Sequence, residues 1–292
     1  MPINSQRKNN LFFPITTISR RQVLGFLASA LFISAFFPVF RILFGKWMKS
    51  EEYSHAILVL PIILYMIWTK RTALYRETGK DSPIGLALAF VSTAFYLFAI
   101  RTQVQTLLFL SMCMTMIGSI VYLTGTGAIK SLATPLLLFM MLIPIPEQLY
   151  PQITFPLQLK VSQASEIIVR AFGIPLLREG NVMHLPGKSF EVVEACSGLR
   201  SAISLLTLSV IMGYFMLQRY TSKTILFAAS IPTAIFINIV RVVSMLLMFH
   251  YYHIDLSKGA LHTGTGLFVF ALAIIIFFIL QRLLERWESK AK

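Results

Sequence analysis

The stretch Thr224–His250, TILFAASIPTAIFINIVRVVSMLLMFH, is apolar along almost its whole length and carries one formally charged side chain, Arg241. About 20 consecutive apolar residues are enough to cross the hydrocarbon core of a membrane as a helix. The stretch therefore predicts a membrane span. We also expect Arg241 to have a specific role, because a charge at mid-membrane costs about 2.5–3.5 kcal/mol on insertion scales.

Seven further apolar runs have spanning or near-spanning length. They cover residues 22–44, 55–69, 84–100, 104–123, 128–143, 199–217 and 262–280. The 292 residues are 56% hydrophobic and only 13% charged, with a mean hydropathy of +0.73, which excludes an ordinary soluble domain. We expect an all-α, polytopic transmembrane bundle of about eight spans, forming one membrane domain over residues 1–292. The second run is the weakest of the eight because it is short.

The net charge of +14 does not indicate a nucleic-acid surface, because the cations mostly flank the apolar runs. The expected spans place a large set on one side: Arg7, Lys8, Arg20, Arg21, Lys70, Arg71, Arg76, Lys80, Lys130, Arg219, Lys223, Arg282, Arg286, Lys290 and Lys292. The other side holds little beyond Lys46, Lys49, Arg101 and Lys258. The positive-inside rule then predicts that both termini, residues 1–21 and 281–292, are cytoplasmic.

The first run contains Ala28-Ser29-Ala30 after Arg20 and Arg21, a pattern also seen at cleaved signal peptides. The apolar stretch continues to Phe44, which favours an uncleaved anchor.

The segment 144–197 is expected outside the cytoplasm and is long enough to have its own structure. Four prolines end the fifth span, at Pro144, Pro146, Pro151 and Pro156. A helical stripe of apolar side chains follows, at Leu157, Val161, Ala164, Ile168 and Ala171. It predicts an amphipathic helix on the outer membrane face, although packing against other spans would give the same stripe. Short strands are expected at 176–178, 182–185 and 190–193, joined by turns at 179–181 and 186–188.

Cys196 lies where this polar segment becomes apolar, in Glu194-Ala195-Cys196-Ser197-Gly198-Leu199-Arg200-Ser201. A thiol at the membrane boundary can react and can reach membrane-held partners. The alternative is a small packing residue beside a helix-start glycine. Cys113, in contrast, lies about nine residues from either end of its run and is expected to be packing. That depth argues against a disulfide between the two cysteines.

Two further residues are expected at the same depth as Cys196. Arg241 lies about 17 residues from Thr224, or roughly 26 Å along a helix, and His262 opens the last run. An imidazole can take a thiol proton and a guanidinium can hold an oxyanion, so the three form a plausible nucleophilic site. Asn238 shares a helical face with Arg241. His250 or His253 remains an alternative base. With His184, these histidines lack neighbours at a trusted ligand spacing, and we predict neither metal nor cofactor.

At these residues the chain resembles the exosortase and archaeosortase family of membrane cysteine transpeptidases, bacterial exosortases most of all. The resemblance rests on residues 194–201, on Gly173-Ile174-Pro175 and 178–182, on Asn238 with Arg241, on His262, and on Tyr53-Ser54-His55 with Pro61 and Trp68. It covers about residues 45–280. Ala56 departs from the family, which has glycine after the histidine.

The resemblance implies a catalytic set and a substrate class. Cys196 would be the nucleophile and Arg241 and His262 its catalytic partners. The implied supporting or substrate-binding residues are Asn238, Glu194, Ser197, Gly198, Arg200 and His55. The substrates would be exported proteins with a C-terminal sorting tail, like the PEP-CTERM proteins of exopolysaccharide-forming bacteria, cleaved at the inner membrane through a thioester. The acceptor could be water, an amine or a lipid-linked sugar.

Functions of other classes remain open. A transporter would use Arg241 to bind an anionic substrate, although no inverted repeat is visible. A non-enzymatic assembly factor for polysaccharide export would need no reactive thiol. A membrane acyltransferase would also form a cysteine thioester, and the identity of the adduct would distinguish it.

Overall fold

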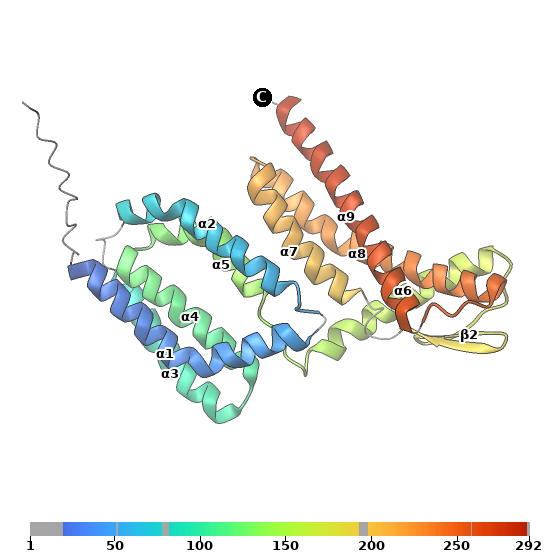
Figure 1. The fold of residues 1–292 in the computed structure, drawn as a ribbon, viewed down its shortest axis with the longest axis horizontal. Helices are drawn as coiled ribbons and strands as arrows, with labels where there is room; N and C mark the ends of the chain where they lie inside the picture. The colour runs from blue at the N-terminus through green and yellow to red at the C-terminus, as the bar shows by residue number, and fades with distance from the viewer. Residues whose placement is uncertain (1–19, 51, 78–81, 193–197, 258, 291–292) are drawn as a thin grey trace, which may run out of the picture.

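A computed structural model describes residues 20–50, 52–77, 82–192, 198–257 and 259–290. Within these residues the chain forms nine helices and one three-stranded sheet (Figure 1). The helices are α1 (Arg20–Lys49), α2 (Ala56–Glu77), α3 (Pro83–Thr102), α4 (Gln105–Thr124), α5 (Gly127–Met141), α6 (Tyr150–Ala171), α7 (Leu199–Met216), α8 (Tyr220–Tyr252) and α9 (Gly259–Lys290).

The polytopic helical fold expected from the sequence is confirmed. Seven of the described helices are long and apolar enough to cross a membrane: α1–α4 and α7–α9. The remaining predicted run, residues 128–143, forms α5, whose 15 residues extend only about 22 Å, less than the roughly 30 Å of a hydrocarbon core. The second run is not the weak one, because α2 continues beyond residue 69 to a length of 22 residues.

The helices form two groups in Figure 1, with α1–α5 in one and α7–α9, α6 and the sheet in the other. Within the first group α3 and α4 approach closely, since a Cβ built at Gly85 would lie 2.2 Å from the backbone nitrogen of Tyr122. Large aliphatic and aromatic side chains of α1, α2, α4 and α5 fill its core. Cys113 belongs to that core with 1% of its surface exposed, as expected for a packing residue.

The C-terminal end of α8 projects from the bundle. Its 33 residues extend about 50 Å, well beyond the thickness of a hydrocarbon core. Val242 and Leu246 near this end pack with Val161 of α6 and Met183 of the sheet in one buried cluster. We call this end of the molecule, where the sheet lies, the sheet end.

The sheet is antiparallel with strand order β1 (Leu177–Glu179), β2 (Val182–Leu185) and β3 (Lys188–Glu191). The three expected strands are therefore present. The third begins at Lys188 rather than at residue 190, because a two-residue turn with Gly187 at φ +87° closes the hairpin directly. Residue 193, the last of the expected strand, lies outside the described residues.

The apolar stripe predicted on α6 is present, and its residues are divided between buried and exposed positions. Val161 is fully buried, whereas Ile168 is 38% exposed and Ala171 is exposed. The other buried residues of the helix are Thr154, Gln158, Ser162, Ser165 and Val169. The helix packs on α8 and the sheet through Val161 and Val169, and the Ser162 hydroxyl donates to the carbonyl of Gly180 at 3.0 Å. The position of the stripe on the outer membrane face stays a prediction.

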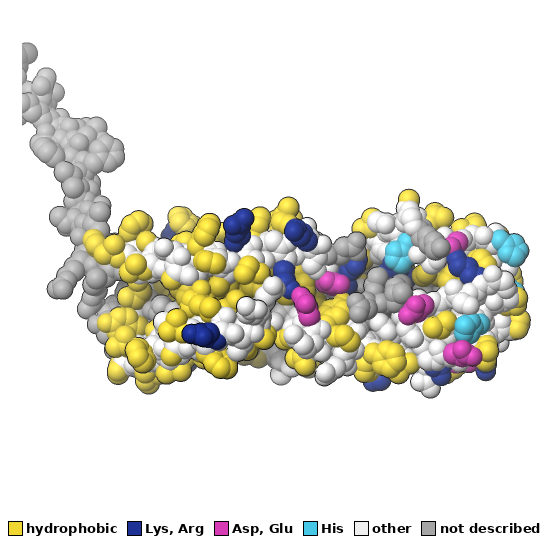
Figure 2. Space-filling view, turned by 90° about the horizontal axis from the view of Figure 1, so that it is seen from below, with side chains coloured by type: hydrophobic (Ala, Val, Ile, Leu, Met, Phe, Trp, Pro, Cys, Tyr) yellow, Lys and Arg dark blue, Asp and Glu magenta, His cyan; other side chains and the backbone are white. Residues whose placement is uncertain are grey.

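Figure 2 shows the molecule from below the view of Figure 1, with the sheet end at the right. Hydrophobic side chains dominate the α1–α5 half of this face, while acidic and histidine side chains gather toward the α6 and sheet half and where the halves meet. The sheet end is therefore the polar end of the second helix group.

Candidate active site

Cys196 lies outside the described residues, as do Glu194 and Ser197. The described neighbours on either side are Val192, which is buried, and Gly198, which caps the first turn of α7. The remaining predicted site residues are described, and they come from α7, α8, α9 and the turn before α2.

Arg241 of α8 and His262 of α9 are in direct contact. The Arg241 Nη2 atom lies 2.9 Å from the His262 Nε2 atom and also donates to the His262 carbonyl at 3.4 Å. Both side chains are half-buried. The contact joins two helices that pack against each other, and the structure thus brings together two residues 21 positions apart.

The contact fixes the tautomer of a neutral His262. Arginine has only donors, so a hydrogen bond to Nε2 requires a lone pair there and places the ring proton on Nδ1. In this arrangement the basic nitrogen of the imidazole is occupied by Arg241. An incoming proton can reach Nε2 only after the guanidinium has moved to another acceptor.

Gly266, one turn after His262, leaves room for the Arg241 guanidinium because it has no side chain. A Cβ built on Gly266 would lie 3.2 Å from Arg241 Nη2 and 3.5 Å from its Cζ. A side chain here would push against the charged group. Gly266 was not among the residues predicted for the site. Its signal is a glycine inside an apolar helix, where glycine costs about 1 kcal/mol relative to alanine.

Gly198 and Asn238 join the start of α7 to α8. Gly198 has φ +87°, a conformation that favours glycine, and a Cβ there would lie 2.9 Å from Asn238 Nδ2. Asn238 is 2% exposed and lies three residues before Arg241 on the same helix. Arg200, half-buried, stands in the first turn of α7. The segment that follows Cys196 is therefore seated one helical turn from Arg241.

The other histidines occupy different positions. His250 lies nine residues beyond Arg241 on α8, about 13 Å along the axis, against the Tyr251 ring. His253 ends α8 and packs edge-on against Phe249. His184, in the sheet, pairs with the Ser189 hydroxyl at 2.8 Å.

His55 stands in the turn before α2. Its Nε2 atom is buried and has no hydrogen-bond partner within the part of the chain that the structure describes. Burial lowers the pKa of the His55 imidazole, so the neutral ring is favoured.

A link between β3 and the α8–α9 connection was not foreseen from the sequence. Lys188 forms an ion pair with Asp255 and lies over the rings of Phe190 and Phe249, at 4.7 and 5.4 Å from their centroids. The hydrogen bond from Lys188 holds the pKa of the Asp255 carboxyl well below its ordinary value. This link fixes the strand that leads toward residue 196 to the helix that carries Arg241.

The fold and this site define a multispanning membrane protein with a guanidinium–imidazole pair at one end of its helices. The family model described as Transmembrane exosortase (Exosortase_EpsH) matches residues 47–279, so the chain belongs to the transmembrane exosortase family. This family is generally one of cysteine peptidases and transpeptidases. No curated protein and no solved structure matches the chain.

Proposed function

We propose that this exosortase is a cysteine transpeptidase that cleaves C-terminal sorting tails from exported proteins, with Cys196 as its nucleophile. The observation that carries the proposal is the 2.9 Å contact between Arg241 and His262 beside the start of α7. A nucleophilic thiol needs a base and an oxyanion donor, and these are the two groups that such a reaction requires.

The covalent chain supports the assignment of Cys196. It precedes Gly198 by two residues, and two residues extend no more than about 7 Å. Gly198 itself lies against Asn238, one turn from Arg241. The short tether to Gly198 supports Cys196 as the nucleophile that acts with Arg241 and His262.

The first chemical step follows from the tautomer of His262. A substrate carbonyl accepts hydrogen bonds from the Arg241 guanidinium, which leaves His262 Nε2. That nitrogen then takes the proton of the Cys196 thiol and the ring becomes an imidazolium. The thiolate attacks the carbonyl carbon, forming the S–C bond, while the carbonyl electrons move to the oxygen held by Arg241. One preorganised oxyanion donor typically contributes about 2.7–4 kcal/mol.

Collapse of the tetrahedral intermediate forms the thioester. The C–N bond breaks, the leaving amine takes the proton from His262, and the sorting tail departs. The acceptor then attacks the thioester carbonyl, His262 removes its proton, and the Cys196 thiolate leaves and is reprotonated. Water, an amine or a lipid-linked sugar would each satisfy this sequence.

The membrane determines how the substrate arrives. The distribution of Lys and Arg supports cytoplasmic termini and a sheet end on the outer face of a bacterial inner membrane. A substrate with its own membrane span would diffuse in the same bilayer and present its outer flank at a fixed depth. Confinement of this kind raises the effective concentration at the site.

The experiment is a processing assay with a tail-bearing exported protein. Variants Cys196→Ala, Arg241→Ala and His262→Ala are compared at equal amounts of inserted protein, with Cys113→Ala as the matched cysteine control. Loss of cleavage in the first three and normal cleavage in the control is expected. Normal processing by Cys196→Ala would end the proposal.

A further inference from the structure

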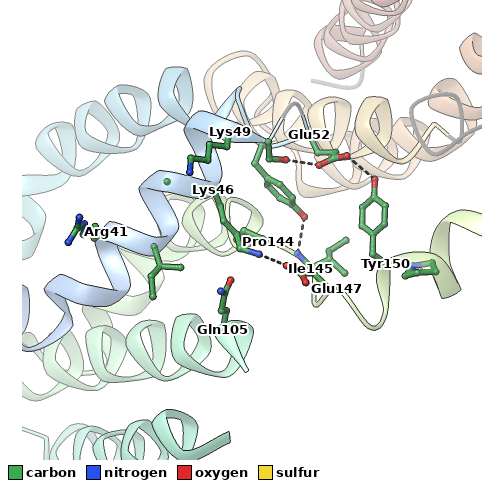
Figure 3. A pocket seen from close by; sticks show the side chains of 14 residues that line it. Arg41, Lys46, Lys49, Glu52, Gln105, Pro144, Ile145, Glu147 and Tyr150 are labelled. Atoms are coloured by element: carbon green, nitrogen blue, oxygen red, sulfur yellow. Dashed lines mark hydrogen bonds and ion pairs between the residues drawn. The ribbon is translucent and has the colours of Figure 1, made fainter. Parts of the chain in front are cut away.

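A polar cavity lies in the helix group of α1–α5, at the C-terminal end of α1. It has a volume of about 680 Å³ and is lined by α1, the turn before α2, the first residue of α4 and the segment 144–151 (Figure 3). None of its lining residues belongs to α7, α8 or α9. It is therefore separate from the Arg241–His262 pair.

The walls of this cavity are fixed by hydrogen bonds between segments distant in sequence. The Ile145 backbone N–H donates to the Tyr53 hydroxyl at 2.9 Å, and the indole N–H of Trp47 donates to the Leu142 carbonyl at 2.8 Å. The Tyr150 hydroxyl donates to Glu52 at 3.1 Å. These bonds tie the end of α1 and the following turn to the segment after α5, so the cavity is preformed.

Three cations from α1 line the cavity. Lys46 is paired with Glu147 at 2.8 Å, and the Glu147 side chain is 82% exposed at the rim. Arg41 and Lys49 have no ion pair or side-chain hydrogen bond among the described residues. They lie on one face of the helix, eight residues or about 12 Å apart, with Gly45 between them. The two carboxylates that line the cavity are engaged elsewhere, Glu147 with Lys46 and Glu52 with the hydroxyls of Ser50 and Tyr150. Among the described residues, three cations and two carboxylates therefore line the cavity, and Arg41 and Lys49 are not ion-paired with either carboxylate.

The surroundings of the cavity are apolar in a way that suits a lipid. Phe37, Phe44 and Met48 of the same helix are 62%, 54% and 61% exposed. Arg41 lies within the segment of α1 that is long and apolar enough to cross a membrane. A cation eight residues before the end of such a segment, beside exposed apolar side chains, suits the boundary where lipid phosphates meet acyl chains.

We propose that this cavity binds the phosphate group of an anionic lipid, with Arg41 and Lys49 as the phosphate-binding cations. The acyl chains lie along the exposed apolar side chains of α1. Lys46 does not bind the phosphate because it is ion-paired with Glu147. A soluble phosphate ester shares the headgroup chemistry but not the acyl chains. The proposal is independent of the function of Cys196.

The test measures phosphatidylglycerol retained by the purified full-length protein in phosphatidylcholine nanodiscs. Each basic residue near a membrane surface contributes about 1 kcal/mol, so Arg41→Gln and Lys49→Gln should each weaken retention about fivefold, and the double variant about 30-fold. Gly45→Leu should abolish it by filling the cavity, because nothing lies within 4 Å of a Cβ at that position. Glu147→Gln should strengthen it by releasing Lys46.

Two control variants match these substitutions. Gly25→Leu alters a similarly open glycine of α1 that does not line the cavity, and Arg101→Gln removes a cation from the last turn of α3. Both should retain lipid like the unaltered protein. Equal retention by Gly45→Leu, or by the Arg41 and Lys49 double variant, would overturn the proposal. Competition by glycerol 1-phosphate at the same concentration as the lipid would overturn its lipid part and leave a soluble phosphate site.

Discussion

Arg241 on α8 and Arg41 on α1 each bring a guanidinium into a helix long enough to cross a membrane, but their surroundings differ. Arg241 contacts the His262 imidazole at 2.9 Å, and its guanidinium lies against Gly266. Arg41 faces a cavity of about 680 Å³ and has no ion pair among the described residues. The first arrangement suits a group that must hold one geometry during a reaction. The second suits a group that attracts an anion.

The largest difference is expected between Arg241→Lys and Arg41→Lys. Lysine keeps the charge and loses the planar fork of donors. Cleavage of the sorting tail should fall about 100- to 1,000-fold for Arg241→Lys, the effect of removing one oxyanion donor. Arg41→Lys should leave cleavage unchanged because Arg41 lies outside the site that carries Arg241 and His262. The cleavage rates of the two variants are compared at equal amounts of each protein. Equal losses of cleavage would mean that the two sites are not distinct.

A smaller loss is expected for Gly266→Ala. The new Cβ would lie 3.2 Å from Arg241 Nη2 and displace the guanidinium by a fraction of an ångström. Misplacement of a reacting group by about 1 Å can lower the rate about 100-fold, so we expect a smaller displacement to lower kcat roughly 10-fold. Gly264→Ala is the control, since nothing lies within 4 Å of a Cβ at Gly264. If both variants keep full activity, the position of the guanidinium does not matter to the reaction.

Gly198→Ala separates backbone strain from contact with Asn238. A non-glycine residue in the left-handed region costs about 1–2 kcal/mol, and here the Cβ would also meet Asn238 Nδ2 at 2.9 Å. Gly259→Ala shares the positive φ, at +61°, with open surroundings. Both variants should lower the unfolding temperature in detergent, but only Gly198→Ala should also slow cleavage. Similar cleavage by the two would show that the seating of α7 on Asn238 has no role.

The smallest effect concerns the link that fixes β3 to the helix carrying Arg241. The pKa of Asp255 is lowered in the folded protein, so its ion pair with Lys188 stabilises the fold above the ordinary carboxyl pKa. The contribution is lost as the pH falls through the lowered value. Because both side chains are partly exposed, Asp255→Asn should cost less than about 1 kcal/mol at neutral pH. Unfolding curves at pH 7 and at the lowest tolerated pH should show this difference shrinking, and a difference that grows on acidification would contradict the assignment.

The sequence contained most of the fold because membrane spans are long and apolar. All eight runs became helices, and Gly180 and Gly187 marked the turns of the sheet. One error of emphasis had a physical cause. The length of α2 was underestimated because its last turns are polar.

The candidate site was predictable only in part. The equal depth of Arg241 and His262 follows from helix arithmetic, and the structure adds that the two side chains touch. Gly266 acts through the absence of a side chain. The Lys188–Asp255 pair and the cavity beside Arg41 join segments far apart in the sequence and carry no motif. Contacts of this kind become visible only when the packing is known.

The most direct measurement is the alkylation rate of Cys196 as a function of pH, made in a Cys113→Ser background so that one thiol reports. If Arg241 and His262 act on this thiol, its apparent pKa lies below the ordinary value of about 8.5 and rises in Arg241→Gln but not in Arg41→Gln. A Cys196 thiol that titrates near 8.5 in all three proteins would contradict the account.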